Sequence, residues 1–242
     1  MTAIQRNIGI IGDGPTDRII FGKIVECILT EDTSKQFIDC NIIELERQNL
    51  HDAVEQFLKS PKSPQASQAL AQSVTGLLFR GFFDFINEVE AIYNCGEISS
   101  CDLLILTTDS EKVLARPEDY LSYGIDLFNI LSEAVTRFYG KVLGQGYPED
   151  NIPLILPIVT FPSTEIIIAA AKGLKTGDCY GKKPDDLKRK IYNKTTTLTP
   201  SEIEEKALKF ITVRGIKNIF NNIPESRHFI KTLSSCRVSC YL

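Results

Sequence analysis

Short apolar runs alternate along the chain with longer segments in which apolar residues recur every three or four positions. The apolar runs predict strands at residues 7–11, 40–45, 102–107 and 153–161. The periodic segments predict helices at residues 18–29, 49–58, 74–93, 119–139 and 166–171. Strands that alternate with helices in this way predict an α/β fold, with a mainly parallel sheet covered by helices.

The regular alternation weakens after Gly173. Thr199-Pro200-Ser201-Glu202 indicates a helix start before the apolar run at 203–210, and residues 237–242 favour a short final strand. A Pro- and Ser-rich stretch at 59–65 predicts a loop within the first part. We therefore expect an α/β domain at residues 1–173 and a basic, mostly helical extension at residues 174–242 that packs on it.

The composition of the 242 residues is ordinary for a globular protein, with 43% hydrophobic and 24% charged residues. The net charge of −4 means that contact with nucleic acid would need a local basic patch. Seven scattered cysteines without a CxxC pair, and two isolated histidines, His51 and His228, argue against a zinc site. An odd number of thiols, no signal peptide and no long apolar run favour a cytoplasmic protein without membrane contact.

Acidic residues follow two of the predicted strands at the point where each strand ends. Asp13 stands between Gly12 and Gly14 after the first strand, and small neighbours let a ligand approach the backbone closely. The helix start that follows favours a bound anion such as phosphate, and Arg18 could contact that anion. In open α/β sheets, ligands bind beyond the carboxyl ends of the strands. The alternative is a plain turn, in which the acidic residues serve turn formation and helix capping.

Asp109 and Glu111 follow the third predicted strand. Residues two apart point the same way if the backbone stays extended, so both carboxylates could reach one hard cation such as Mg²⁺ or Mn²⁺. Glu165 begins a helix after the fourth strand, and we expect it on the same edge of the sheet. The alternatives are a solvated strand end and a carboxylate that only complements a helix dipole.

These residues resemble the Toprim domain, the Mg²⁺-binding α/β module of topoisomerases, primases and related nucleases. Asp13-Gly14 stands where that family usually has Glu-Gly, and Asp109-Ser110-Glu111 stands where it has Asp-x-Asp. The segment Gly12-Asp13-Gly14-Pro15-Thr16-Asp17 especially resembles a family of Toprim-related bacterial proteins of unknown function, often associated with phage-defence loci. The resemblance covers roughly residues 7–173.

The resemblance implies a Toprim/Rossmann-like fold and a role for each acidic residue. It assigns proton transfer to Asp13, metal binding to Asp109, Glu111 and Asp13, and a supporting catalytic role to Glu165. The implied chemistry is Mg²⁺-dependent cleavage of a phosphodiester, or phosphoryl transfer. The implied partners are DNA or RNA, and a defence protein such as an ATPase.

A basic segment follows the predicted Glu165 helix. It carries eight basic and three acidic residues, a net charge of +5, and it contains Tyr180 and Tyr192, which could stack on bases. The basic residues are Lys172, Lys175, Lys182, Lys183, Lys188, Arg189, Lys190 and Lys194. We expect the first four, with Gly12, Gly14 and Arg18, to bind phosphate or nucleic acid. The alternative is a solvated surface helix and loop.

Three functions remain open at this point. The first is a Mg²⁺-dependent nuclease or related phosphoryl-transfer enzyme. The second is a non-catalytic module of Toprim type that acts with a partner protein. The third is a nucleotide- or phosphate-binding protein that uses residues 12–17 as a phosphate loop, although this segment lacks the Gly-Lys-Ser/Thr ending of a Walker motif.

Overall fold

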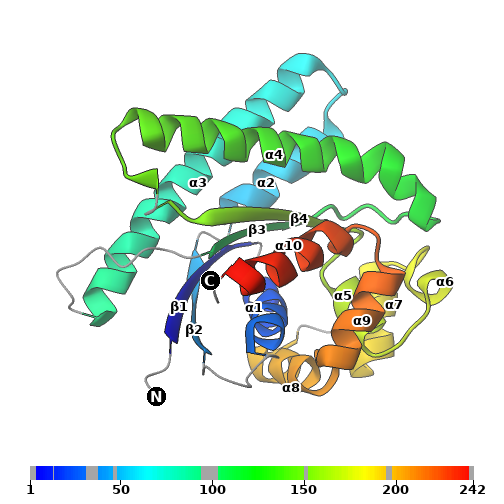
Figure 1. The fold of residues 1–242 in the computed structure, drawn as a ribbon. Helices are drawn as coiled ribbons and strands as arrows, with labels where there is room; N and C mark the ends of the chain where they lie inside the picture. Colours follow the sequence, from blue (N-terminus) through cyan, green and yellow to red (C-terminus); the bar gives the residue numbers. More distant parts are fainter. Residues whose placement is uncertain are drawn as a thin grey trace.

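The sheet has four strands, and every neighbouring pair is parallel. The computed structural model describes residues 4–12, 14–30, 38–45, 48–93, 103–149, 152–194 and 198–239. Its strands are β1 (Ile4–Ile11), β2 (Ile38–Leu45), β3 (Leu103–Asp109) and β4 (Leu154–Thr160). They lie in the order β2-β1-β3-β4 (Figure 1). The α/β prediction with a parallel sheet is therefore confirmed.

Helices cover both faces of the sheet. The helix α1 (Pro15–Thr30) lies on one face, and α2 (Gln48–Lys59), α3 (Pro64–Tyr93) and α4 (Tyr120–Gly144) lie on the other (Figure 1). A short 3₁₀ turn, η1 (Pro117–Asp119), precedes α4. The central strands β1 and β3 consist of apolar runs because residues such as Ile8, Ile10 and Leu104 are buried beneath helices.

The order of the strands reverses between β1 and β3. From β1 the chain moves outward to β2, and from β3 it moves outward in the opposite direction to β4. Right-handed crossovers then place α1 on one face and the later helices on the other, as observed. The gap between the carboxyl ends of β1 and β3 is the topological switch point, where open parallel sheets bind their ligands.

The rest of the chain is helical. It comprises α5 (Glu165–Ala171), α6 (Thr176–Cys179), α7 (Pro184–Tyr192), α8 (Pro200–Phe210), α9 (Val213–Asn222) and α10 (Ser226–Ser239). The helices α8 and α10 pack against α1, and α7 and α9 pack against α5. One continuous apolar core joins them to the sheet, as in the edge-to-face contact of Phe21 in α1 with Phe229 in α10. The predicted helical extension is therefore present and packed.

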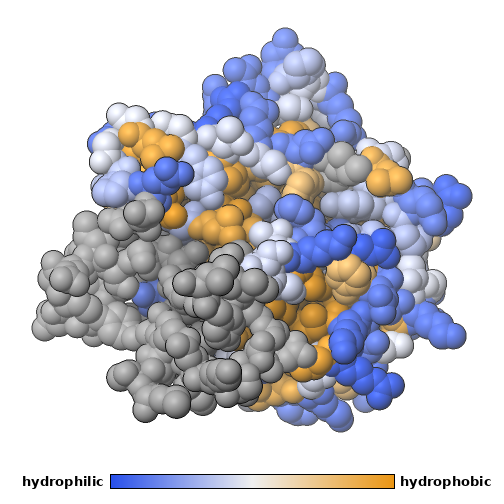
Figure 2. Space-filling model, in the orientation of Figure 1, coloured by the Kyte–Doolittle hydropathy of each residue, from blue (hydrophilic) through white to orange (hydrophobic). Residues whose placement is uncertain are grey.

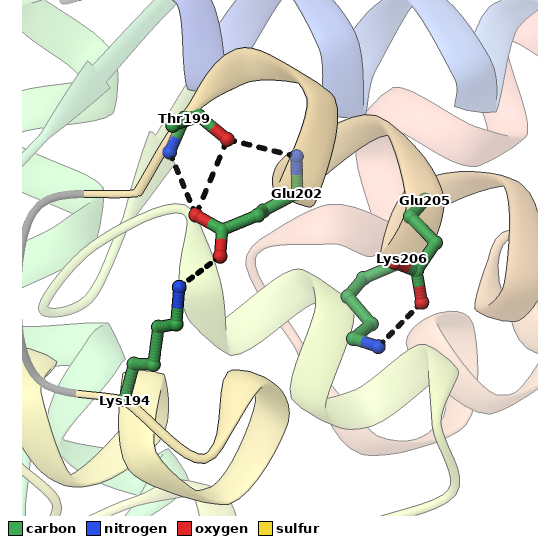
Figure 3. A network of polar contacts seen from close by, with 5 residues as sticks. All are labelled: Lys194, Thr199, Glu202, Glu205 and Lys206. Carbon is green, nitrogen blue, oxygen red and sulfur yellow. Dashed lines mark hydrogen bonds and ion pairs between the residues drawn. The ribbon is translucent and has the colours of Figure 1, made fainter.

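The helix α8 starts where the sequence indicates, and a capping box forms its first turn. The Thr199 hydroxyl accepts a hydrogen bond from the Glu202 N–H at 3.3 Å, and the Glu202 carboxylate accepts one from the Thr199 N–H at 3.0 Å (Figure 3). Lys194 also donates to Glu202, and this bond, followed by the backbone bond from Thr199, lowers the pKa of Glu202 to about 2. Lys194 therefore ties the end of α7 to the start of α8.

Two predicted helix boundaries differ from the structure by more than three residues, and one predicted strand is helical where the structure describes it. The helix α3 begins at Pro64 and not at residue 74, because the Ser63 hydroxyl caps it by accepting from the Ala66 N–H at 3.1 Å. The helix α4 continues past Gly140, since a helical glycine costs only about 1 kcal/mol and the buried Val142 lies beyond it. Residues 237–239 belong to α10 and form no strand, while 240–242 lie outside the described residues.

The surface of the described residues is mixed. Hydrophilic residues cover much of the outer helices, and hydrophobic residues show in separate patches between them (Figure 2). Large exposed apolar side chains include Leu121, Leu143 and Leu208. Within the described ranges, no helix combines the length and the apolar character that crossing a membrane requires.

Candidate functional site

Two carboxylates meet at the switch point between β1 and β3. Asp109 is the last residue of β3, and Asp17 lies in the first turn of α1, just after β1. The Thr164 hydroxyl, immediately before α5, lies 2.8 Å from Asp109 Oδ1 and 2.5 Å from Asp17 Oδ1. Thr160, the register partner of Asp109 in β4, also donates to Asp109 Oδ1. Residues from three segments far apart in the sequence thus converge at one point.

The Thr164 hydroxyl cannot satisfy both carboxylates at once, because it carries a single proton. Asp17 is only 2% exposed, so water gives its charge little screening. Two adjacent carboxylates in such a place repel each other unless a shared proton or a cation reduces their charge. The pair therefore has the electrostatic character of a cation-binding or proton-sharing site.

The Asp17 side chain can lie close to β1 because Gly12 has no side chain. A Cβ atom at Gly12 would lie 2.9 Å from Asp17 Cβ, 2.9 Å from Thr107 Cγ2 and 3.0 Å from Asp17 Oδ2. The buried Thr107 hydroxyl beside this point has no hydrogen-bond partner among the described residues. The space at Gly12 is occupied by side chains of the protein itself, and the predicted approach of a ligand there stays a prediction. A Cβ atom added at Gly14 would have no other atom within 4 Å.

Asp13 lies outside the described residues. Its predicted roles in proton transfer and metal binding therefore stay predictions. Among the residues that the structure describes, no group of three or more His, Cys, Asp or Glu side chains is close enough to hold a metal ion.

Glu165 is buried but does not join the Asp17–Asp109 pair. Its Oε2 accepts a hydrogen bond from the Ser163 hydroxyl at 2.6 Å, and its Oε1 lies 3.8 Å from Lys188 Nζ in α7. Burial, and then the nearby charge of Glu165, raise the pKa of Tyr192. Its neighbour Thr164 reaches Asp109 instead, because the first turn of α5 directs successive side chains in different directions.

Glu111 contradicts the expectation of an extended backbone after β3. Its φ of 54° is left-handed, and its N–H donates to the Pro162 carbonyl at 2.9 Å. The prediction that Asp109 and Glu111 point the same way depended on an extended backbone, and it is therefore wrong. Glu111 lines a groove between α2 and α4, and Asp109 is not among the residues that line it.

Arg18 lines a different groove, and its predicted contact with a phosphate stays a prediction. Its side chain lines a separate groove of about 240 Å³ between α1 and α8, together with Lys23, Glu26 and Glu204. This placement does not support the predicted contact with a phosphate at the 12–17 turn.

The basic segment contacts the loop after β3. The Gly181 N–H donates to the Leu114 carbonyl, in the loop after β3, at 2.7 Å. Lys175 and Lys183 are exposed residues that precede α6 and α7, and Lys182 is partly exposed. Lys172 instead donates to the Lys190 carbonyl at 2.7 Å and so holds α5 and α7 together.

The predicted stacking of bases on Tyr180 and Tyr192 was wrong. Both tyrosines are buried, with 4% and 8% of their surface exposed. The Tyr180 hydroxyl donates to Glu225 Oε2 at 2.6 Å, inside the contact between α6 and the start of α10. Their rings belong to the core that joins the helical extension to the sheet.

Sequence reasoning missed Asp17, Thr160 and Thr164 as site residues. Asp17 and Thr164 stand at helix starts, where capping explains their residue types well. Thr160 stands at the end of an apolar strand. The one signal that could have identified them is their position at the carboxyl ends of strands or just after them.

Comparison with protein-family models, with curated proteins and with solved structures finds no match to this chain. The resemblance to Toprim domains therefore depends only on the residues and motifs themselves.

Proposed function

We propose that this chain is a Mg²⁺-dependent phosphoryl-transfer enzyme that cleaves phosphodiester bonds in DNA or RNA. The supporting observation is the meeting of Asp17 and Asp109 through one hydroxyl at the switch point of a parallel sheet. Carboxylate and hydroxyl oxygens are the ligands that Mg²⁺ and Mn²⁺ prefer in proteins. A divalent cation held between two neighbouring carboxylates would lower the repulsion between them.

The chemical groups of the site fit such a cation. Asp109 and Asp17 would hold it, with Asp13 added by the resemblance, and the bound ion would stabilise negative charge on the attacked phosphate. Thr160 and Thr164 position Asp109 through their hydroxyl groups. Asp13 would move the proton of the attacking or leaving oxygen. Glu165, held by Ser163 and Lys188, supports the first turn of α5.

The exposed lysines of the basic segment would bind the backbone of the substrate. Lys175, Lys182 and Lys183 lie in the segment whose Gly181 N–H donates to the Leu114 carbonyl, in the loop after β3. Phosphate contacts of this kind contribute most of the affinity of non-specific nucleic-acid binding. We place the activity in the cytoplasm and, following the resemblance, in phage defence with a partner such as an ATPase.

The first test is the replacement of Asp109 by Asn. Because Asn keeps the shape but removes the charge, we expect Mg²⁺-dependent cleavage of DNA or RNA to fall at least about a hundredfold while the melting temperature changes little. Gel assays of cleavage with and without Mg²⁺, beside calorimetry, measure both quantities.

The matched control is Asp185→Asn, which removes an exposed carboxylate at the start of α7. It should cleave like the unmodified protein. If the unmodified protein shows no metal-dependent cleavage, or if Asp109→Asn cleaves equally well, the enzymatic proposal is wrong. A non-catalytic module that acts with a partner protein would then be the better reading.

A further inference from the structure

The last part of the chain carries mostly positive charge, although the chain as a whole is negative. Residues 206–235 contain six basic residues and one acidic residue, within a chain of net charge −4. The acidic residue, Glu225, is 4% exposed, so its carboxylate does not reach the surface. The basic residues are Lys206, Lys209, Arg214, Lys217, Arg227 and Lys231. A region of this kind attracts polyanions.

The outer face of α9 is a row of polar side chains. Its members stand at positions i, i+3, i+4 and i+7, which share one face of a helix. They are Arg214, Lys217, Asn218 and Asn221. All but Asn218 are exposed, and Asn218 is partly exposed. The row therefore presents two cations and two amides to the solvent.

The segment between α5 and α6 widens this row on one side. The Asn218 amide donates to the Ala171 carbonyl at 3.3 Å, and the Thr176 hydroxyl donates to Asn222 Oδ1 at 3.1 Å. Residues 172–175 connect these two points and therefore run beside α9. They include two exposed lysines, Lys172 and Lys175.

Aromatic rings hold three lysines of this region in place. Lys231 Nζ lies 5.9 Å from the ring centre of Phe220 in α9, so α10 adds a cation on its side of that helix. Lys172 Nζ and Lys209 Nζ lie 5.7 and 5.5 Å from the ring centre of Phe210. An aromatic ring attracts a cation but carries no net charge, so these ammonium groups keep their charge.

Carboxylates do not neutralise the centre of this region. Within the described ranges, no ion pair involves the five central cations, which are Lys172, Lys175, Arg214, Lys217 and Lys231. Glu205 and Asp178, which border the region in the sequence, lie 2.7 Å from Lys206 and 3.9 Å from Lys190. Lys206, and to a smaller extent Lys209, lower the pKa of Glu205, so Lys209 is partly compensated and lies at the edge.

The chemistry of this region suits the backbone of a nucleic-acid duplex. Lysine, arginine and asparagine side chains are common contacts of phosphates and sugars. The ten residues of α9 span about 15 Å, and each strand of a duplex carries one phosphate about every 3.4 Å along its axis. A duplex that lies along α9 therefore brings several phosphates within reach of the cations.

Two other polyanions suit the region less well. A helix that binds a lipid surface inserts an apolar face, whereas Ile216, Ile219 and the rest of the apolar face of α9 are buried in the protein. Proteins that bind single strands stack bases on open aromatic rings, whereas Phe210 and Phe220 have ammonium groups over their rings.

We propose that the five central cations form a surface, here called the α9 surface, that binds the phosphate backbone of double-stranded nucleic acid. The helix α5 begins after Thr164, which contacts the carboxylate pair, and ends before Lys172 of the α9 surface. One helix of seven residues therefore separates the two places. Only the view that the bound duplex is also the substrate rests on the proposed function, because binding needs neither Mg²⁺ nor Asp109.

The test is a fluorescence-anisotropy titration of the intact chain with a labelled DNA duplex, in the presence of EDTA so that no metal-dependent cleavage occurs. Binding should be saturable and should weaken steeply as the salt concentration rises, because bound phosphates release counterions. Arg214→Ala, Lys217→Ala and Lys231→Ala should each weaken binding by about fivefold, and each should lower the slope of log Kd against log salt by about one. The three changes combined should weaken binding by at least about thirtyfold.

Two kinds of control separate the charge of the α9 surface from other effects. Arg214→Lys and Lys217→Arg keep the charge and should retain most of the affinity. Lys141→Ala removes an exposed lysine of α4 that lies 5.0 Å from the ring centre of Phe79, an arrangement like that of Lys231. It should bind the duplex like the unmodified chain. Absence of saturable, salt-dependent binding, or unchanged binding by the combined variant, overturns the proposal.

Further arms test the identity of the partner. A single strand of the same length, vesicles that contain anionic phospholipid, and polyglutamate should each bind more weakly than the duplex. Tighter binding of any of the three, lost in the combined variant, overturns the assignment to a duplex.

A last arm separates this proposal from the enzymatic one. Asp109→Asn should bind the duplex as tightly as the unmodified chain even though it does not cleave. Cleavage by the unmodified chain and its loss in Asp109→Asn therefore test the carboxylate pair alone. Binding in the Arg214, Lys217 and Lys231 variants tests the α9 surface alone, whether or not the chain cleaves.

Discussion

At the scale of single residues, the candidate site depends on the absence of a side chain at Gly12. The position has no side chain, and Asp17 and Thr107 fill the space that a Cβ atom would take. Asp17 can then lie close enough to Thr164 for its carboxylate to share the hydroxyl that also reaches Asp109. Glycine is therefore required here for close approach.

The replacement Gly12→Ala tests this requirement. The added methyl group would overlap with Asp17 and Thr107, so we expect a loss of about 1–3 kcal/mol in the free energy of unfolding, and a displaced Asp17. Urea denaturation measures the loss. Gly14→Ala, where nothing lies within 4 Å of the new Cβ, is the matched control and should change stability by less than about 0.5 kcal/mol. Equal losses of stability in the two variants would show that crowding at Gly12 does not cause the loss.

At the scale of elements, the corner between α8 and α9 decides how the helical extension packs. The helix α9 starts with a cap in which the Thr212 hydroxyl accepts from the Gly215 N–H at 3.2 Å. A Cβ at Gly215 would lie only 2.0 Å from the Phe210 carbonyl oxygen at the end of α8. The two helices can make this tight corner only with glycine at that position.

We therefore expect Gly215→Ala to destabilise the protein by about 3 kcal/mol, since a backbone carbonyl cannot move aside as a flexible side chain can. Thermal unfolding followed by circular dichroism measures the change. Gly76→Ala in α3 is the control, because nothing lies within 4 Å of its new Cβ and alanine favours a helix interior by about 1 kcal/mol. It should leave stability unchanged or raise it. Similar stability of both variants would mean that the α8–α9 corner is more open than described.

At the scale of the whole molecule, Glu225 lies where the helical extension joins the rest of the core. It is 4% exposed, its Oε2 accepts from Tyr180, and its Oε1 has no partner among the described residues. Burial raises the pKa of Glu225 from its ordinary 4.5 to about 7, although the bond from Tyr180 and the charge of Arg227 lower it. Burial, and then the charge of Glu225, also raise the pKa of Tyr120 in α4 to about 12.

The raised pKa of Glu225 predicts how stability changes with pH. Below about pH 4.5 the carboxyl group is protonated in both states, and between 4.5 and 7 the unfolded chain loses its proton first. The contribution of Glu225 to the free energy of unfolding therefore falls as pH rises through this window, by about 3 kcal/mol, and then stays constant. Denaturation at several pH values should show a smaller loss over the window for Glu225→Gln.

The control for this measurement is Glu204→Gln, because Glu204 is an exposed residue of α8 whose carboxylate contacts water in both states. It should follow the pH dependence of the unmodified chain. If Glu225→Gln follows it as well, the carboxyl group of Glu225 is not buried in the way described.

Much of the fold could be predicted because its signals are local. The strand β3 and the helix α1 each carry an apolar pattern that a short stretch of sequence contains completely. The helix start at Thr199-Pro200-Ser201-Glu202 is a four-residue signal and was predicted correctly. The start of α3 at Pro64 was missed because its first residues continue no apolar pattern, and only the Ser63 cap marks the boundary.

The candidate site could be predicted only in part. Asp109 was identified because it ends an apolar strand, and parallel strands bring their carboxyl ends to one edge. Glu111 and Glu165 were predicted at the same edge. The left-handed φ of Glu111, and the hydrogen bond from Ser163 to Glu165, direct these two side chains away from the Asp17–Asp109 pair. Tyr180 and Tyr192 were placed on the surface because a basic segment surrounds them, whereas the packing of α6 and α7 buries both rings.

The sequence by itself determined which segments become strands and helices, because this property follows from the periodicity of apolar residues. It also determined that the acidic residues after the strands lie at one edge of the sheet, because parallel strands bring their carboxyl ends to the same edge. Only the tertiary structure decided that Asp17 and Asp109 meet through Thr164, a contact that spans 147 residues between Thr164 and Asp17. The physical reason is that side-chain direction at the end of an element depends on local backbone angles and on neighbours from distant segments, which no short pattern records.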